Sequence, residues 1–197
     1  MTGDEKKVLI CVHEHMARFM SSHAELHGME DLAFTLKKMP GFMVVGVSRR
    51  TCNADGRSID DIPAVWRDFL AKNTAMQIKN RAVPPKMYAV YSDYESDWTK
   101  EYTFLIGCGV TRAPDVPEGM EVRKIPEQTY AHFVAKGEMP QALLSVWSAI
   151  WISDLPRAYT YDFEVYDQRF TRPDNKEIDV YVAVHADRMD DAKEKTV

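Results

Sequence analysis

The sequence predicts an α+β fold in which two βαββ units pack about a pseudo-two-fold axis and leave a central ligand cleft. Segments with strand-like and helix-like periodicity follow the order strand, helix, strand, strand, and this order occurs twice. Aromatic residues fall at matching places in both copies. We assign residues 1–39 to an N-terminal helical arm and residues 40–197 to the domain, whose halves span about 40–115 and 116–186.

The arm differs from the rest of the chain because its periodicity is patchy and helical. Gly28 divides it into two short helices, and Pro40-Gly41 is a turn signal that ends it. These helices would carry an apolar stripe, which could pack against a second copy of the chain in a homodimer or could cover the cleft. The residues that form this stripe are Val8, Val12, His15, Phe19, Leu26, Leu32, Phe34 and Leu36.

The first unit begins with a strand over residues 42–49, which are rich in β-branched and aromatic side chains. Asp61 caps the following helix, and Pro63 lies in its first turn. Strands over 87–94 and 101–110 complete the unit. The helix has one apolar face, which consists of Ile62, Val65, Trp66, Phe69 and Leu70.

The second unit repeats this order. A strand covers residues 130–134, Pro140 opens a helix, and Pro156 ends it. Strands follow over 158–166 and 178–184. The apolar face of this helix consists of Leu143, Leu144, Trp147, Ile150 and Trp151.

One pair of matching positions breaks the symmetry, because Ala89 in the first unit corresponds to Glu164 in the second. Strand alternation places Asp162, Glu164 and Tyr166 on one face. Burying a carboxylate costs free energy unless a positive charge lies close enough to compensate for the lost hydration. A ligand cation surrounded by rings would do so, with cation–π attraction of about 0.5–2 kcal/mol per contact.

Glu164 also has an ordinary interpretation, in which this face of the strand is wet. Glu164 would then be solvated or would pair with Arg157 or Lys124. The spacing of the residues does not separate the two interpretations.

Composition argues against several classes of function. The formal net charge is −5, and the short basic clusters Arg49-Arg50 and Lys37-Lys38 do not form the basic face that nucleic-acid binding needs. We find no membrane span and no signal-peptide pattern. Cys11, Cys52 and Cys108 are odd in number and lack CxxC spacing, which is typical of a reduced, cytoplasmic protein.

Metal, cofactor and nucleophile chemistry have weak support. His23 and His27 stand at i, i+4 but lack an HExxH pattern, so solvated helix histidines are the simpler interpretation. Cys108 follows Gly107 in a strand, which favours a buried structural cysteine over a nucleophile. No glycine-rich phosphate loop is present, and we expect no metal or cofactor.

From about residue 41 to residue 184, the sequence resembles the GyrI-like small-molecule-binding domain. This domain is the effector-binding part of some AraC-type and MerR-type activators and also occurs as a stand-alone protein. Each resembling piece is loose, and their order and spacing carry the likeness. The pieces are Val45–Thr51, Ile62–Trp66, Tyr88–Tyr91, Tyr102–Gly107, Tyr130–Phe133, Asp162–Asp167 and Ile178–Val184.

The resemblance implies a tandem βαββ fold with a central aromatic pocket that accepts lipophilic cations. The family's pocket glutamate falls on Glu164. The rings that we assign to the pocket are equally compatible with ordinary core. They are Trp66, Trp147 and Trp151 from the helices, and Tyr102, Phe133, Tyr166 and Tyr181 from the strands.

The DNA-binding relatives carry a helix-turn-helix domain beside this module. Residues 1–39 and 185–197 are too short for one, so we expect a stand-alone protein that binds an aromatic, cationic ligand and no nucleic acid by itself.

Two alternatives remain. Some stand-alone members resemble hydrolases of reactive, drug-like electrophiles, in which Glu164 would be a general base, its pKa raised by burial. A second titratable group, with Tyr102, Tyr166 and Asp162 as candidates, would favour that enzyme. The other alternative is an inhibitor of a partner protein.

Overall fold

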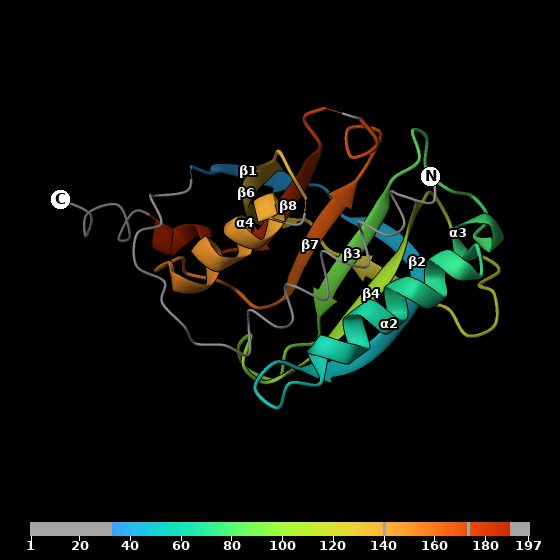
Figure 1. The fold of residues 1–197 in the computed structure, drawn as a ribbon, viewed down its shortest axis with the longest axis horizontal. Coiled ribbons are helices and arrows are strands. Elements are labelled where there is room, and N and C mark those ends of the chain that lie inside the picture. Colours follow the sequence, from blue (N-terminus) through green and yellow to red (C-terminus); the bar gives the residue numbers. More distant parts are fainter. Residues whose placement is uncertain (1–32, 140, 173, 190–197) are drawn as a thin grey trace.

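The computed structural model describes residues 33–139, 141–172 and 174–189. These residues form one antiparallel sheet with two main helices on one of its faces (Figure 1). The elements in chain order are β1 (Thr35–Met39), β2 (Phe42–Cys52), α2 (Ser58–Ala71), α3 (Thr74–Gln77), β3 (Met87–Ser92), β4 (Glu101–Val110), β5 (Glu121–Ile125), β6 (Gln128–Lys136), α4 (Gln141–Ile152), β7 (Tyr161–Tyr166), β8 (Glu177–Ala183) and the 3-10 turn η1 (Ala186–Arg188).

The sheet confirms the predicted tandem repeat. Its strand order is β1-β6-β8-β7-β3-β4-β2-β5, so β2-β4-β3 of one unit mirrors β6-β8-β7 of the other. The two units meet where β3 pairs with β7, and Ala89 lies directly opposite Glu164 in that ladder. The two positions that the repeat relates are therefore neighbours at the centre of the sheet.

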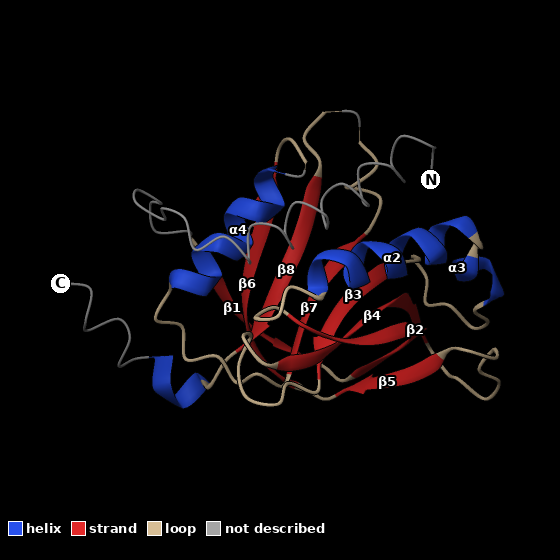
Figure 2. Ribbon diagram, turned by 60° about the horizontal axis from the view of Figure 1, so that its bottom comes forward, coloured by secondary structure: helices blue, strands red, loops and turns tan. Residues whose placement is uncertain are grey.

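The first strand of each unit forms hydrogen bonds with the strand that comes just before the other unit in the sequence: β2 pairs with β5, and β6 pairs with β1. β1 pairs with β6 from Thr35↔His132 to Met39↔Gln128, and β2 pairs with β5 from Phe42↔Ile125 onward, with no residue gained or lost between the two ladders. The sheet therefore curls until both of its edges take part in one continuous antiparallel ladder (Figure 2).

The curled sheet separates two hydrophobic clusters. The side chains inside the curl include Val44, Tyr130, Phe163 and Tyr181. The opposite face packs against α2 and α4 and includes Trp66, Trp147 and Tyr166. Because β7 is buried on both faces, alternate residues of that strand serve the two clusters, and Glu164 lies on the face that the helices cover.

The structure corrects three details of the sequence prediction. Thr35–Met39 is a strand and does not belong to a helical arm. α2 begins at Ser58, so Asp61 lies within its first turn and is not the capping residue. The pairing strand Glu121–Ile125 was not predicted. Residues 1–32 of the arm, which include Cys11 and the pair His23 and His27, lie outside the described residues.

Gly46 and Gly107 are opposite each other in the β2–β4 ladder, and their backbones approach too closely for a side chain. A Cβ on Gly46 would lie 2.2 Å from the carbonyl oxygen of Ile106, and one on Gly107 would lie 2.2 Å from that of Val45. Both contacts are with backbone atoms, which cannot move without separating the two strands.

We therefore expect Gly46→Ala to lower the free energy of unfolding by about 1–3 kcal/mol, as overpacking does in protein cores. Urea denaturation measures this loss. Gly109→Ala is the matched control, since its new Cβ would meet the Tyr88 ring, a side chain that can shift. Equal losses in the two variants would contradict the role assigned to the paired glycines.

Candidate ligand-binding site

Glu164 is the centre of the candidate site. It lies in the middle of β7, its side chain faces the layer of helices, and it is 0% exposed. Phe163 and Val165, its neighbours in the strand, belong to the cluster inside the curl. The predicted alternation of this strand is therefore correct, and the face that carries Glu164 is buried.

Three aromatic side chains from three elements donate hydrogen bonds to the Glu164 carboxylate. Trp147 Nε1 from α4 and Tyr91 Oη from β3 donate to Oε1, over 2.7 and 3.1 Å. Tyr166 Oη from β7 donates to Oε2 over 2.5 Å. Both carboxylate oxygens are therefore held in place by the polar atoms of rings.

The two tyrosines remain neutral donors throughout the physiological pH range. Burial, and then the negative charge of Glu164, raise the pKa of Tyr91 well above its usual value. The same two causes raise the pKa of Tyr166. Neither phenol is therefore available as a phenolate base at neutral pH.

A small aromatic cavity lies on one side of this cluster. Its volume is about 20 Å³, which is enough for about one water molecule. Its outer wall is a ladder of indoles, in which Trp151 stacks on both Trp98 and Trp147 with 5.9 Å between centroids in each pair. The residues that line it are Asn53, Tyr91, Tyr94, Trp98, Tyr102, Trp147, Trp151 and Arg157.

Arg157 does not leave an unbalanced positive charge in this cavity. Its Nη2 donates to Asp162 Oδ2 over 2.6 Å, and both side chains are almost fully buried. Asp162 also accepts hydrogen bonds from Tyr94 Oη and from the backbone N–H of Ala183. The Arg157–Asp162 pair therefore forms a buried unit beside Glu164.

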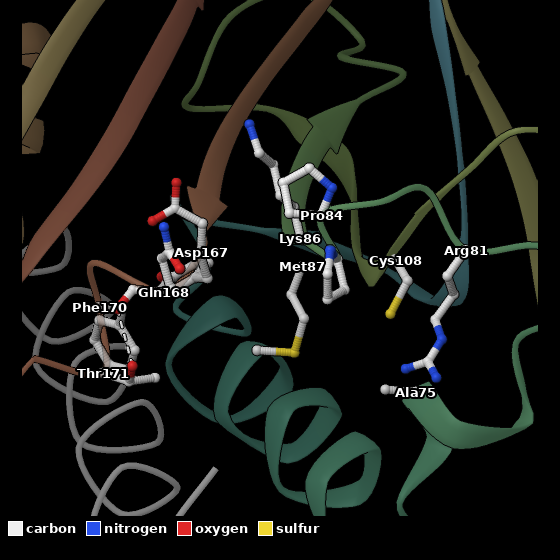
Figure 3. Close-up of a pocket in the computed structure, with 12 residues that line it drawn as sticks. Ala75, Arg81, Pro84, Lys86, Met87, Cys108, Asp167, Gln168, Phe170 and Thr171 are labelled. Atoms are coloured by element: carbon white, nitrogen blue, oxygen red, sulfur yellow. Dashed lines mark hydrogen bonds between the residues drawn. The ribbon is translucent and has the colours of Figure 1, made fainter.

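A larger cavity, of about 450 Å³, adjoins this cluster at Tyr166 (Figure 3). Tyr166 forms part of its wall, while Tyr91 and Trp147 line the smaller cavity, so the donors to Glu164 separate the carboxylate from both spaces. The described residues that line the larger cavity are Ala75, Arg81, Pro84, Pro85, Lys86, Met87, Cys108, Tyr166, Asp167, Gln168, Phe170 and Thr171.

The structure brings several of the predicted rings to Glu164. Trp147 and Tyr166 bind its carboxylate, Trp151 and Tyr102 line the small cavity, and Trp66 packs edge-on against Tyr166 at 5.2 Å between centroids.

The remaining two predicted rings lie elsewhere. Phe133 belongs to the core under the helices, contacts Phe34 and lines neither cavity. Tyr181 lies on the opposite face of the sheet from Glu164, where it stacks on Phe163, so it does not line the pocket.

Sequence reasoning missed four residues of the site, and it considered a fifth, Arg157, only as an ion-pair partner of Glu164, whereas Arg157 pairs with Asp162. Tyr91 stands two positions after Ala89, the partner of Glu164, so strand alternation places it on the Glu164 face and could have identified it. Tyr94 lies in a loop, because β3 ends at Ser92 and does not run to residue 94 as predicted. Trp98 and Asn53 also lie in loops, where no periodicity indicates which way a side chain points.

Among the described residues, no helix is long and apolar enough to cross a membrane. The sequence matches the family model of Cass2, the integron-associated effector binding protein, over residues 35–184. The match includes β1, in agreement with the place of this strand in the sheet.

Known proteins similar to this chain share the fold. YobU of Bacillus subtilis, whose name describes it as a transcriptional regulator, is 30% identical over 71% of this chain and 89% of its own length. The integron cassette protein VCH_CASS2, from the mobile metagenome of Vibrio cholerae, is 29% identical and covers 79% of this chain and 100% of its own, with a TM-score of 0.62.

The protein SAV2435 has a TM-score of 0.65 over 80% of this chain and 96% of its own, at 12% identity, which shows a shared fold alone. These likenesses confirm the resemblance that the sequence pieces indicated. The chain therefore belongs to the Cass2 family of integron-associated effector-binding proteins, and its fold is that of the GyrI-like effector-binding domain.

Proposed function

We propose that this chain binds aromatic, lipophilic cations at Glu164. The observation that carries the proposal is a fully buried carboxylate whose oxygens accept hydrogen bonds from Tyr91, Trp147 and Tyr166. The carboxylate attracts a cation through its charge, and the aromatic rings that line the neighbouring small cavity can add cation–π attraction. The similar protein SAV2435 has been solved bound to tetraphenylphosphonium, a cation of this class.

Binding requires the aromatic wall to open, because a cavity of about 20 Å³ cannot hold a multi-ring ligand. The rings that would move are Trp98 and Trp151, since both are only partly buried, whereas Trp147 is 3% exposed. The rings of the ligand would then replace the stacking contacts that the indole ladder gives up. Opening of this kind is a conformational cost that the ligand contacts must offset.

Binding is better supported than hydrolysis. A general base needs contact with water, and Glu164 is enclosed by three donors. Of the candidates for a second titratable group, Tyr102 and Tyr166 have a pKa raised by burial, and Asp162 is held by Arg157. Three expectations from the sequence stay predictions: that the chain binds no nucleic acid by itself, that it forms a homodimer, and the alternative that it inhibits a partner protein.

The test is a tryptophan fluorescence titration with tetraphenylphosphonium and with neutral triphenylphosphine oxide, which keeps three of the rings and has no charge. Trp147 donates to Glu164 and stacks on Trp151, so a bound cation is expected to quench its emission. We expect micromolar affinity for the cation, about −8 kcal/mol, and weaker binding of the neutral compound. Equal affinities for the two compounds would remove the support for a charge receptor.

A further inference from the structure

We propose that the cavity of about 450 Å³ is a second ligand site, separate from Glu164, that binds a small organic anion with an apolar body. Its volume lies in the range of small-molecule pockets. The anionic group of the ligand would be held by Arg81, while Lys86, at the other end of the cavity, would add a weaker attraction without direct contact. The inference is independent of the proposed cation site, because a different cavity carries it and the residue that would hold the anion, Arg81, does not line the small cavity.

The wall of this cavity suits an apolar body. Met87 and Cys108 project into it from neighbouring strands, and Phe170 and Ala75 close it from the segment after β7 and from α3 (Figure 3). Cys108 is not a reactive group here, since burial raises the pKa of its thiol to about 11. The side chains around the apolar space therefore offer packing surface and no nucleophile.

Positive charge predominates at the rim. Arg81 and Lys86 are half-buried, and neither forms an ion pair with any other residue that the structure describes. Arg81 lies beside Ala75 and Cys108, while Lys86 extends toward Asp167 (Figure 3). The two cations thus stand at opposite ends of the apolar space.

Asp167, the one carboxylate among the described lining residues, is already paired. Asp167 accepts hydrogen bonds from Arg169 Nε and Nη2 over 2.9 to 3.1 Å. Burial would raise the pKa of Asp167, but the hydrogen bonds from Arg169 outweigh burial and lower it. Asp167 therefore offers little charge to a ligand cation, and it attracts Lys86 from one side. Arg81 is left as the main anchor for an anion.

Arg81 is also well placed to hold a ligand, because the backbone fixes the start of its side chain. It forms a β-bridge with Val110, and the next residue, Ala82, donates its N–H to the carbonyl oxygen of Gly109 over 2.8 Å. Among the residues that the structure describes, the guanidinium forms a single hydrogen bond, a long one of 3.9 Å to the Met76 sulfur. A fixed backbone with an available planar donor group is suited to a carboxylate or sulfonate.

Fluorescence titration with 8-anilinonaphthalene-1-sulfonate and with neutral N-phenyl-1-naphthylamine tests the site, since the two compounds share their rings and differ by the sulfonate. We expect the wild-type protein to prefer the sulfonate. Arg81→Gln should weaken its binding about 10-fold or more, the loss of one charge-assisted contact, and leave the neutral compound unchanged. Lys86→Gln should have a smaller effect in the same direction.

Two further variants make the result specific. Ala75→Trp places a ring inside the cavity and should weaken the binding of both compounds. Lys124→Gln removes an equal charge from an exposed position on β5 and should leave the affinity for each compound unchanged. Tetraphenylphosphonium binding, measured on Arg81→Gln, should be retained, which keeps this inference separable from the cation site.

The proposal is overturned if the wild-type protein shows no preference for the sulfonate, if Arg81→Gln keeps that preference, or if Ala75→Trp binds both compounds as the wild type does. Each of these outcomes is read from affinities alone. Circular dichroism of each variant confirms that the fold is retained.

Discussion

Replacing Glu164 with glutamine weakens the binding of tetraphenylphosphonium about 30-fold and leaves that of triphenylphosphine oxide nearly unchanged. Removing one partner of a buried charge pair costs about 2–5 kcal/mol, and each 1.4 kcal/mol is tenfold in affinity. We expect the low end of that range, because phenyl groups surround the phosphonium charge and the cation has no N–H or O–H group to donate to the carboxylate. Parallel fluorescence titrations of wild type and variant measure the difference.

Glutamine should be tolerated at this position, so the effect would report on charge and not on misfolding. Its carbonyl oxygen can accept from Trp147, which only donates, and its amide can donate to the Tyr166 hydroxyl, which can turn to accept. Glu118→Gln removes the same charge from an exposed loop and serves as the control. If Glu164→Gln keeps the full preference for the cation, Glu164 is not the charge receptor.

The sequence predicted the centre of the molecule more reliably than its edges. The correspondence of Ala89 with Glu164 placed the asymmetric carboxylate in the right strand and on the right face, since period-two alternation is a local property of a strand. The helix rings Trp66 and Trp147 followed from one-sided periodicity, which again needs only neighbouring residues.

Features that depend on long-range pairing could not be predicted in this way. Thr35–Met39 is a strand because β6 offers it a partner nearly one hundred residues later, while Leu36 by itself fits a helical stripe equally well. Tyr181 was placed on the wrong face because the curl buries both faces of β8, so burial no longer distinguishes them. The large cavity needs Arg81, Cys108 and Phe170, which no spacing connects.

Replacing Arg157 with methionine lowers the free energy of unfolding by about 3–5 kcal/mol, the largest loss of stability that we expect from a single change here. Arg157 and Asp162 are 4% and 0% exposed at their side chains, and the guanidinium also lies over the Tyr159 ring at 4.5 Å. Methionine retains much of the packing of the stem, so the loss comes from leaving the Asp162 charge buried without its partner.

A double variant separates this cause from lost packing, again by urea denaturation. Arg157→Met combined with Asp162→Asn should lose less than the sum of the two single losses, because no charge remains buried in it. If the losses add, the stability comes from the packing of the Arg157 side chain around Tyr159 and Tyr94, and the ion pair contributes little to this corner of the site.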